Sequence, residues 1–219
     1  MQGWKPWQKH RTLKHTTVTF SMDNNLLTFW NQQWQQMSAA WINHMHDSDL
    51  ESWLLSQPQR YLRVLEIGCG LGHNAAWMDR QGHDVVAIDI SDVAIKICRD
   101  SWPNVDFRHA DILDPSLDLG EFDLVFERGV MVVLQHAPDR SRLVSAARRH
   151  LVPGGRYISV VDCSEQRRRD DPRLSHRSLS DIVDAVQPHL DIESIRSVVM
   201  PVPGHSIPAW FVVAAHKTL

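Results

Sequence analysis

A glycine-rich turn behind a short apolar run constrains this chain more than any other stretch of its sequence. The run from Tyr61 to Ile67 is mostly apolar and leads into three glycines at alternate positions, Gly68, Gly70 and Gly72. A short apolar run is typical of a buried strand. Glycine permits backbone conformations closed to other residues and leaves no side chain between the backbone and a ligand. A helix that begins near His73 would aim its free N–H groups at that ligand. We therefore predict a strand, a ligand-binding turn and a helix.

The residues around the turn do not fit the two common phosphate-binding signatures. The dinucleotide fingerprint G-x-G-x-x-G requires a third glycine where this chain has His73, and no Gly-Lys-Ser/Thr follows to make a P-loop. Glu66, two residues before the first glycine, adds a negative charge that would repel a phosphate but not an amino group or a sulfonium. The turn therefore favours a cationic ligand over a phosphorylated one.

Residues 64–72, Val-Leu-Glu-Ile-Gly-Cys-Gly-Leu-Gly, closely resemble the first motif of the class I S-adenosylmethionine (SAM)-dependent methyltransferases. Further segments resemble that family in the same order, and their joint spacing is more specific than any single motif. The resemblance covers about residues 60–217. The matching segments are 85–89 for the second strand, 107–112 for the segment that meets the adenine, 122–129 for the fourth strand and 151–155 for the turn into the fifth.

The expected fold follows from this resemblance and from the alternation of apolar strands with amphipathic helices after Tyr61. That alternation is typical of a parallel sheet with helices on both faces. We expect an α/β, Rossmann-like sheet of seven mostly parallel strands with the last strand antiparallel, as in the family. One core suits a chain of 219 residues. The expected organisation is a mobile tail over residues 1–22, an N-terminal helical cap over 23–58 and the methyltransferase domain over 59–219.

Turn and capping residues delimit the expected elements. Ser91 can cap a helix that ends before Pro103, and Ser178 can cap a later one. Pro138 suits the first turn of a helix that runs to Leu151 and stops at the two glycines that follow. The expected strands are 61–67, 84–89, 105–109, 122–126, 157–161, 191–199 and 209–215, and the other helices are 73–80 and 179–186.

The N-terminal cap is unusually aromatic. Apolar residues recur every three or four positions over Leu26–Met45 and include Trp30, Trp34 and Trp41, so they share one face of an expected helix. A second short helix is expected to begin at Ser48. The rings either only pack this extension onto the core or also roof a substrate pocket. The segment Phe-Trp-Asn-Gln-Gln-Trp resembles the N-terminal aromatic segment of thiopurine, thiol and halide methyltransferases, which covers SAM, so both interpretations stay open.

The resemblance also implies which residues hold the cofactor at the carboxyl ends of the strands, where an open parallel sheet binds its ligand. Glu66 and the glycine turn would surround the amino-acid part of SAM, Asp89 would hold the ribose, and Glu127 would border the transferred methyl group. The expected product is S-adenosylhomocysteine (SAH), and no metal is expected. The cofactor-binding set implied in this way is Trp30, Glu66, Gly68, Cys69, Gly70, Gly72, Asp89, Ile90, Asp111, Ile112, Glu127 and Arg128.

Methyl transfer from a sulfonium is an in-line displacement in which the cofactor carries the activation. A general base is needed only if the acceptor must lose a proton. Glu127 and His136 are the expected catalytic residues, and Asp162 and His176 are further candidate bases. Because the chain has 13 histidines, a surface or structural role is the alternative for each histidine.

The acceptor is bounded by motifs that the sequence lacks. No Asn-Pro-Pro-Tyr or Asp-Pro-Pro-Tyr follows the fourth strand to hold a nucleobase amine, and no Pro-Cys pair is present for attack on cytosine. Glu-Arg-Gly at 127–129 stands where catechol-type relatives have an Asp-Asn metal pair. We expect a small-molecule acceptor that is methylated on a thiol, a hydroxyl or a heterocyclic nitrogen. A methyltransferase acting on RNA or protein and a non-catalytic SAM-binding protein are the alternatives.

Composition narrows the expected partners and compartment. A net charge of −3 gives no strong field toward long nucleic acid or an anionic membrane. Three widely spaced cysteines without a C-x-x-C pair, and the lack of an apolar run of about 18 residues, predict a cytoplasmic protein without a membrane span. Met22, just before the first periodic segment, is a candidate natural start. The charged segment between Cys163 and Arg177 is expected either to be a solvated loop or to form a lid beside the acceptor.

Overall fold

The structure, a computed structural model, describes most of the chain in separate stretches. Three expectations fall outside them: the tail over residues 1–22, the role of Trp41, and the charged segment that contains His176. The described stretches are residues 24–37, 45–58, 61–163, 178–202 and 205–216.

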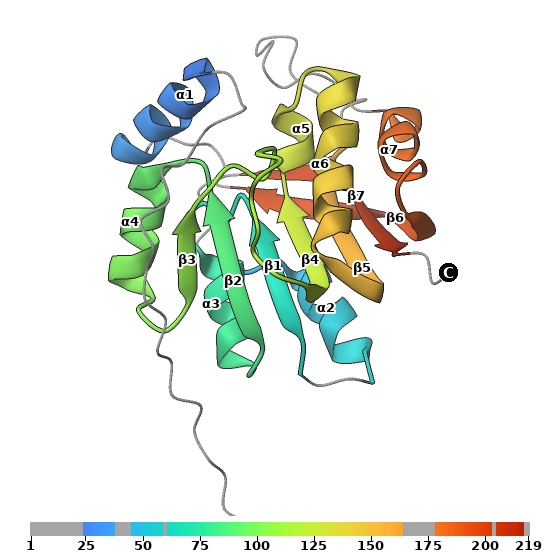
Figure 1. The fold of residues 1–219 in the computed structure, drawn as a ribbon, viewed down its shortest axis with the longest axis horizontal. Helices are drawn as coiled ribbons and strands as arrows, with labels where there is room; N and C mark the ends of the chain where they lie inside the picture. The colour runs from blue at the N-terminus through green and yellow to red at the C-terminus, as the bar shows by residue number, and fades with distance from the viewer. Residues whose placement is uncertain (1–23, 38–44, 59–60, 164–177, 203–204, 217–219) are drawn as a thin grey trace, which may run out of the picture.

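Seven strands form one sheet in the order β3-β2-β1-β4-β5-β7-β6 (Figure 1). β1 pairs in parallel with β2 and β4, and β3 and β5 extend this parallel part on either side. β7 runs antiparallel to both of its neighbours, β5 and β6. The arrangement confirms the expected Rossmann-like fold. The strands are β1 Arg63–Ile67, β2 Asp84–Asp89, β3 Asp106–His109, β4 Phe122–Arg128, β5 Leu151–Asp162, β6 Asp191–Val202 and β7 His205–Ala215.

Helices cover both faces of the sheet (Figure 1). Buried residues of α2, α3 and α4 share one core with the sheet, and those of α5, α6 and α7 share the other. α1 lies against α4. None of the helices in the described part of the chain is both long and apolar enough to cross a membrane. The helices are α1 Asn24–Gln35, α2 Ser48–Ser56, α3 His73–Arg80, α4 Asp92–Ser101, α5 Val130–Val133, α6 Ala137–Arg149 and α7 Leu179–Val186.

The central strand β1 is buried on both faces. Leu65 and Ile67 belong to the core beneath α6 and α7, whereas Val64 belongs to the core beneath α2 and α3. A strand covered on both faces needs apolar residues at successive positions rather than alternate ones. This explains the nearly continuous apolar run that marked the strand in the sequence.

The transition from α6 into β5 differs from the sequence-based prediction. The helix ends at Arg149, and Leu151 is already a strand residue that pairs with Phe122 of β4. The backbone N–H of Phe122 also donates to the carbonyl oxygen of His150 at 2.8 Å. Because β4 takes up these backbone groups, the chain is extended before it reaches the two glycines. The prediction that the helix carries Leu151 inward and stops at the glycines was therefore wrong.

The N-terminal cap also departs from the expected long helix. α1 ends at Gln35, and Met37 has a positive φ of 47°, which takes the backbone out of helical geometry. Met37 and Met45 are both exposed, so they do not lie on the buried face predicted for them. α2 begins at Ser48 as expected, but its cap is Asp47, whose carboxylate accepts two backbone N–H groups of the first turn.

Candidate functional site

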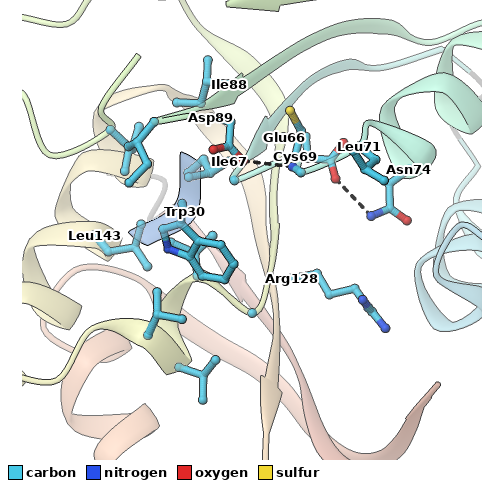
Figure 2. A pocket seen from close by; sticks show the side chains of 18 of the residues that line it. Trp30, Glu66, Ile67, Cys69, Leu71, Asn74, Ile88, Asp89, Arg128 and Leu143 are labelled. Atoms are coloured by element: carbon cyan, nitrogen blue, oxygen red, sulfur yellow. Dashed lines mark hydrogen bonds between the residues drawn. The ribbon is translucent and has the colours of Figure 1, made fainter. Parts of the chain in front are cut away.

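A large cavity opens at the carboxyl ends of β1, β2 and β4, where the strand order reverses. It encloses about 1270 Å³ of empty space, counting the part that is open to solvent. Figure 2 shows Glu66, Asp89 and Arg128 on different strands around this space, with Trp30 and Leu143 among the apolar side chains.

The turn between β1 and α3 forms one wall of the cavity. Gly68, Gly70 and Gly72 have positive φ values of 67°, 53° and 75°. The backbone N–H of Cys69 donates to the carbonyl oxygen of Ile88 at 3.0 Å, which holds the turn against β2. A side chain disfavours such φ values, so the backbone path of this turn explains the alternate glycines of the motif.

Glu66 presents a buried carboxylate at one end of the cavity. The residue is 2% exposed, and its Oε1 accepts a hydrogen bond of 3.0 Å from Asn74 Nδ2 (Figure 2). Oε2 is buried and has no hydrogen-bond partner among the described residues. Burial raises the pKa of Glu66 to about 8, although the bond from Asn74 and the nearby backbone N–H of Ala75 act to lower it. A cation placed against Oε2 would satisfy this oxygen and stabilise the ionised form.

Asp89, at the end of β2, holds the turn as well as lining the cavity. Its Oδ2 accepts from the backbone N–H of Gly70 and its Oδ1 from that of Ser91, both at 2.9 Å. Burial raises the pKa of Asp89 to about 6, against the lowering effect of these two bonds. A carboxylate oxygen can accept more than one hydrogen bond. Asp89 can therefore also bind hydroxyl groups of a ligand.

Arg128, at the end of β4, contributes a cationic side chain to the wall of the cavity. Its Nε donates to Oδ2 of Asp47 at 3.1 Å, and its Nη2 donates to the carbonyl oxygen of Pro201 at 2.8 Å. Asp47 is 3% exposed, so this ion pair is largely shielded from water. The guanidinium group thus connects the N-terminal cap and β6 to the cavity.

Helix α1 brings two tryptophans to the cavity. Trp30 and Trp34 both line it, and their rings are stacked with centroids 6.0 Å apart. The helix is docked on the start of α4, because Ser91 Oγ donates to Asn31 Oδ1 at 2.5 Å and Asn31 Nδ2 donates to Asp92 Oδ1 at 2.8 Å. Trp34 is only 6% exposed. The two rings therefore pack the helix onto the core and also line the cavity.

The structure does not bring Glu127 to the cavity. Its carboxylate is fully buried at the end of β4 and accepts hydrogen bonds from the backbone N–H groups of Val130 and Met131. The hydroxyl groups of Ser159 and Tyr157 donate to the same carboxylate. Burial raises the pKa of Glu127, while these bonds act to lower it. The side chain joins the start of α5 to β5, and this geometry does not support the expected catalytic or cofactor-binding role.

Four other expected residues do not line the cavity either. Gly72 precedes the first turn of α3, and Asp111 is fully buried, with Oδ1 accepting the backbone N–H two residues on. His136 is exposed at the start of α6, and Asp162 is 1% exposed at the end of β5. Their expected catalytic or ligand-binding roles therefore stay predictions.

The remaining expected residues are brought together from α1 and from the ends of the four strands β1, β2, β3 and β4. Sequence reasoning missed Asn74, although a polar residue in the first turn after the glycines was a usable signal. It also missed apolar lining residues of α1, α5 and β6, for which the sequence carried no signal beyond apolarity. The expected residues that line the cavity are Trp30, Glu66, Gly68, Cys69, Gly70, Asp89, Ile90, Ile112 and Arg128, and the missed ones include Leu26, Met45, Asn74, Val130, Val133 and Met200.

Residues 64–155 match the family described as a methyltransferase domain. Ubiquinone biosynthesis O-methyltransferase of Xanthomonas oryzae pv. oryzae (strain PXO99A) is 36% identical over 106 residues, which cover 46% of this chain and 43% of that protein. Magnesium-protoporphyrin O-methyltransferase of Rhodobacter capsulatus is 38% identical over 88 residues, which cover 38% of each protein. The chain thus matches less than half the length of these curated relatives.

A solved structure with the same fold is the 1,6-didemethyltoxoflavin-N1-methyltransferase of Burkholderia thailandensis with bound 1,6-didemethyltoxoflavin and SAH. It superposes with a TM-score of 0.72 at 18% identity, covering 93% of this chain and 94% of that one. Together the sheet and the cavity define a Rossmann-like methyltransferase fold. The similarity to the matched family extends over residues 64–155. Within the described ranges, no cluster of three or more His, Cys, Asp or Glu side chains is arranged to hold a metal ion.

Proposed function

We propose that this chain binds SAM in the cavity and transfers its methyl group to a small-molecule acceptor, leaving SAH. The observation that carries the proposal is the buried Oε2 of Glu66, which has no hydrogen-bond partner among the described residues and lies beside the glycine turn of the matched domain. A cationic amino group satisfies such an oxygen, whereas a phosphate would be repelled.

In this proposal, different lining residues would contact different parts of SAM. Glu66 would accept from the amino group of its methionine part, and Asp89 would bind the ribose hydroxyls. Ile90 and Ile112 would border the adenine, since both are apolar side chains at the ends of neighbouring strands. Arg128 would flank the methionine end. SAM supplies the activated methyl group when it is bound.

The protein's own part in the reaction is alignment and exclusion of water. Well-oriented sites can contribute roughly 7–11 kcal/mol in this way. Trp30, stacked on Trp34, would cover the reacting atoms from the side of α1. A carboxylate or imidazole base is required only for an acceptor that must lose a proton. Of the described lining residues, His73 carries an imidazole and Glu66 and Asp89 carry carboxylates, and an acceptor that is already nucleophilic needs none of them as a base.

The acceptor space is bordered by Leu26, Met45, Val130, Val133 and Met200. Apolar walls of this kind favour a small apolar or planar acceptor with a thiol, hydroxyl or heterocyclic nitrogen as the nucleophile. The two curated relatives are named as O-methyltransferases, which supports a hydroxyl. The aromatic segment of α1, which resembles that of the thiopurine, thiol and halide methyltransferases, supports a thiol or a heterocycle.

Calorimetric titration of the full chain with SAM, SAH and NAD tests the cofactor. We expect one site per chain for SAM and for SAH and no binding of NAD. Transfer of tritiated methyl from SAM to a panel of thiols, phenols and heterocyclic amines then tests the reaction. Binding of NAD without SAH would overturn the proposal, and binding of SAH with no transfer to any member of the panel would reduce it to a SAM-binding protein.

A further inference from the structure

Asp47 belongs to no sequence motif, yet it is almost completely buried at the start of α2, within the N-terminal cap. It is 3% exposed and precedes the first turn of α2. Unpaired buried carboxylates are costly, so each of its contacts is informative. Those contacts lead in two directions, one through the side chain and one through the backbone.

The side chain of Asp47 joins the cap of α2 to Arg128. Oδ1 accepts from the backbone N–H groups of Asp49 and Leu50, both at 3.0 Å, which caps the helix. Oδ2 accepts from Arg128 Nε at 3.1 Å. The carboxylate therefore fixes the guanidinium group in the wall of the cavity and offsets its charge.

The backbone of Asp47 fixes the partner of Glu66. Its N–H donates to Asn74 Oδ1 at 2.8 Å, and Asn74 Nδ2 donates to Glu66 Oε1 at 3.0 Å. A carboxamide has one oxygen and one NH₂ end, so a donor on one side and a carboxylate on the other permit only one orientation. Asp47 thus turns the NH₂ group of Asn74 toward Glu66 and leaves Glu66 Oε2 for the cavity.

We propose that Asp47 is a positioning residue for the end of the cofactor site formed by Glu66 and Arg128. This inference rests on the proposed function, because it assigns Asp47 to the part of the cavity that would hold the amino-acid end of SAM. Through Asn74, Asp47 determines which hydrogen bond Glu66 accepts. Through its ion pair with Arg128, it reduces the positive charge that acts on Glu66.

The charges that act on Glu66 give the direction of the expected change. The positive charge of Arg128 acts to lower the pKa of Glu66, whereas the carboxylate of Asp89 and burial act to raise it. Cys69 faces the same group, and burial raises the pKa of its thiol. Asp47 opposes the effect of Arg128, because its negative charge lies against the guanidinium group. Loss of that negative charge therefore lowers the pKa of Glu66.

The test replaces Asp47 by Asn in the full chain. Asn caps a helix about as well as Asp does and keeps the backbone N–H. The variant therefore removes the negative charge opposite Arg128, together with the oxygen that accepts from Arg128 Nε. The titration of the Glu66 carboxyl group is followed by ¹³C NMR without ligand, and SAH affinity is measured by calorimetry from pH 6 to 9. We expect both midpoints to move to lower pH by roughly half a unit or more, which is about threefold in the ionised fraction of Glu66.

Asp49→Asn is the matched control. Asp49 lies in the same first turn of α2 and pairs with Arg196 at 2.6 Å, but no contact of its side chain leads to Glu66. Each variant loses an ion pair and a negative charge at the N-terminus of α2, so both should melt at a lower temperature. Only Asp47→Asn should move the midpoints. The double variant Asp47→Asn/Arg128→Gln should return the Glu66 midpoint toward that of the wild type, because both opposing charges are gone.

The outcomes separate this inference from the proposed function. An unchanged Glu66 midpoint in Asp47→Asn, or an equal shift in Asp49→Asn, overturns the positioning role even when SAH binds normally. Absence of SAH binding to the wild-type chain at every pH overturns the proposed function, and with it the assignment of Asp47 to a cofactor site. Midpoints that shift in Asp47→Asn and stay at the wild-type pH in Asp49→Asn support both the positioning role and the proposed function.

Discussion

The indole ring of Trp34 lies against Gly70. A Cβ atom built on Gly70 would be 3.1 Å from Cη2 of the ring, and Gly70 has a φ of 53°. The backbone of the glycine turn and the N-terminal cap are therefore in direct contact. Any side chain at Gly70 would meet both an unfavourable backbone conformation and the ring that lines the cavity.

Gly70→Ala should weaken both the fold and the site. The left-handed conformation costs a residue with a Cβ roughly 1–2 kcal/mol, and either the ring or the turn must move. We expect a fall of about that size in the free energy of unfolding and a weaker affinity for SAH. Gly82→Ala is the control, since Gly82 has a φ of 93° and open space around its Cβ position. Gly82→Ala should lose a similar amount of stability but keep its affinity for SAH. Native SAH affinity in both variants would show that the contact between Gly70 and Trp34 plays no part in the site.

Trp30→Ala and Trp34→Ala should separate packing from ligand binding. Trp34 is buried, so its removal should cost about 3–5 kcal/mol in the free energy of unfolding. Trp30 is only partly buried, so it should cost less. Both should lower SAH affinity, because ring contacts and water exclusion are lost together. Trp53→Ala, which removes a ring that packs on the core beneath α2, should lower the melting temperature alone. Native SAH affinity in Trp30→Ala and Trp34→Ala would leave α1 as packing only.

The sequence predicted the parallel sheet and the glycine turn because their causes are local. The apolar run of β1 and the positive φ values at Gly68, Gly70 and Gly72 follow from adjacent residues. The capping box at Ser178 was also predictable, since its partner Asp181 is three residues away. Features of this kind need no knowledge of tertiary contacts.

Contacts between distant segments could not be predicted in this way. Glu127 has the strand-end position of a catalytic acid, but its surroundings are set by Ser159 and Tyr157 on the neighbouring strand. Asp47 lies 81 positions before its partner Arg128. In each case the pairing of strands and the docking of the cap decide which oxygen faces a ligand, and a single sequence carries no periodic signal for either.

Asp89→Asn should weaken binding of SAH with a modest loss of stability. Loss of a charged hydrogen bond to each ribose hydroxyl typically costs about 1.5–3 kcal/mol, and calorimetry would measure this as weaker binding. The structure makes Asn the better test than Ala, because Asp89 also accepts the backbone N–H groups of Gly70 and Ser91. Asp89→Ala would leave both donors unpaired, whereas Asn keeps one oxygen that can accept from one of them. Asp89→Ala should therefore lower the melting temperature more than Asp89→Asn does. Unchanged SAH affinity in Asp89→Asn would remove this residue from the ribose site.

The stability of the ligand-free protein should fall as the pH rises through the range in which Glu66 ionises. Its pKa is about 8 in the fold, against an ordinary value of 4.5 for a glutamate side chain. The folded state therefore holds a proton that the unfolded state has released. The stabilisation is present below about pH 4.5 and is lost as the pH approaches 8.

Glu66→Gln should remove this loss. Between pH 5 and pH 8 the variant's free energy of unfolding should fall by less than that of the wild type, with a difference of at least about 1 kcal/mol in urea titrations. SAH affinity should drop in the same variant, because the carboxylate that would accept from the amino group is gone. Glu121→Gln changes an exposed acid outside the cavity and should leave both quantities near wild type. Parallel pH dependences for Glu66→Gln and the wild type would contradict a buried proton on Glu66.

Replacements of Glu127 should distinguish a structural carboxylate from a catalytic one. Glu127→Ala leaves the backbone N–H groups of Val130 and Met131 without their acceptor, and such losses cost about 1–3 kcal/mol for each buried group. The variant should therefore melt at a clearly lower temperature. Glu127→Gln keeps an oxygen that can accept these donors and should lose less stability. Because the carboxylate does not line the cavity, methyl transfer per folded Glu127→Gln molecule should stay within about threefold of the wild type, or under about 1 kcal/mol in the barrier. A loss of a hundredfold or more with native SAH affinity would instead restore Glu127 to the reaction, as its position at the strand end had suggested.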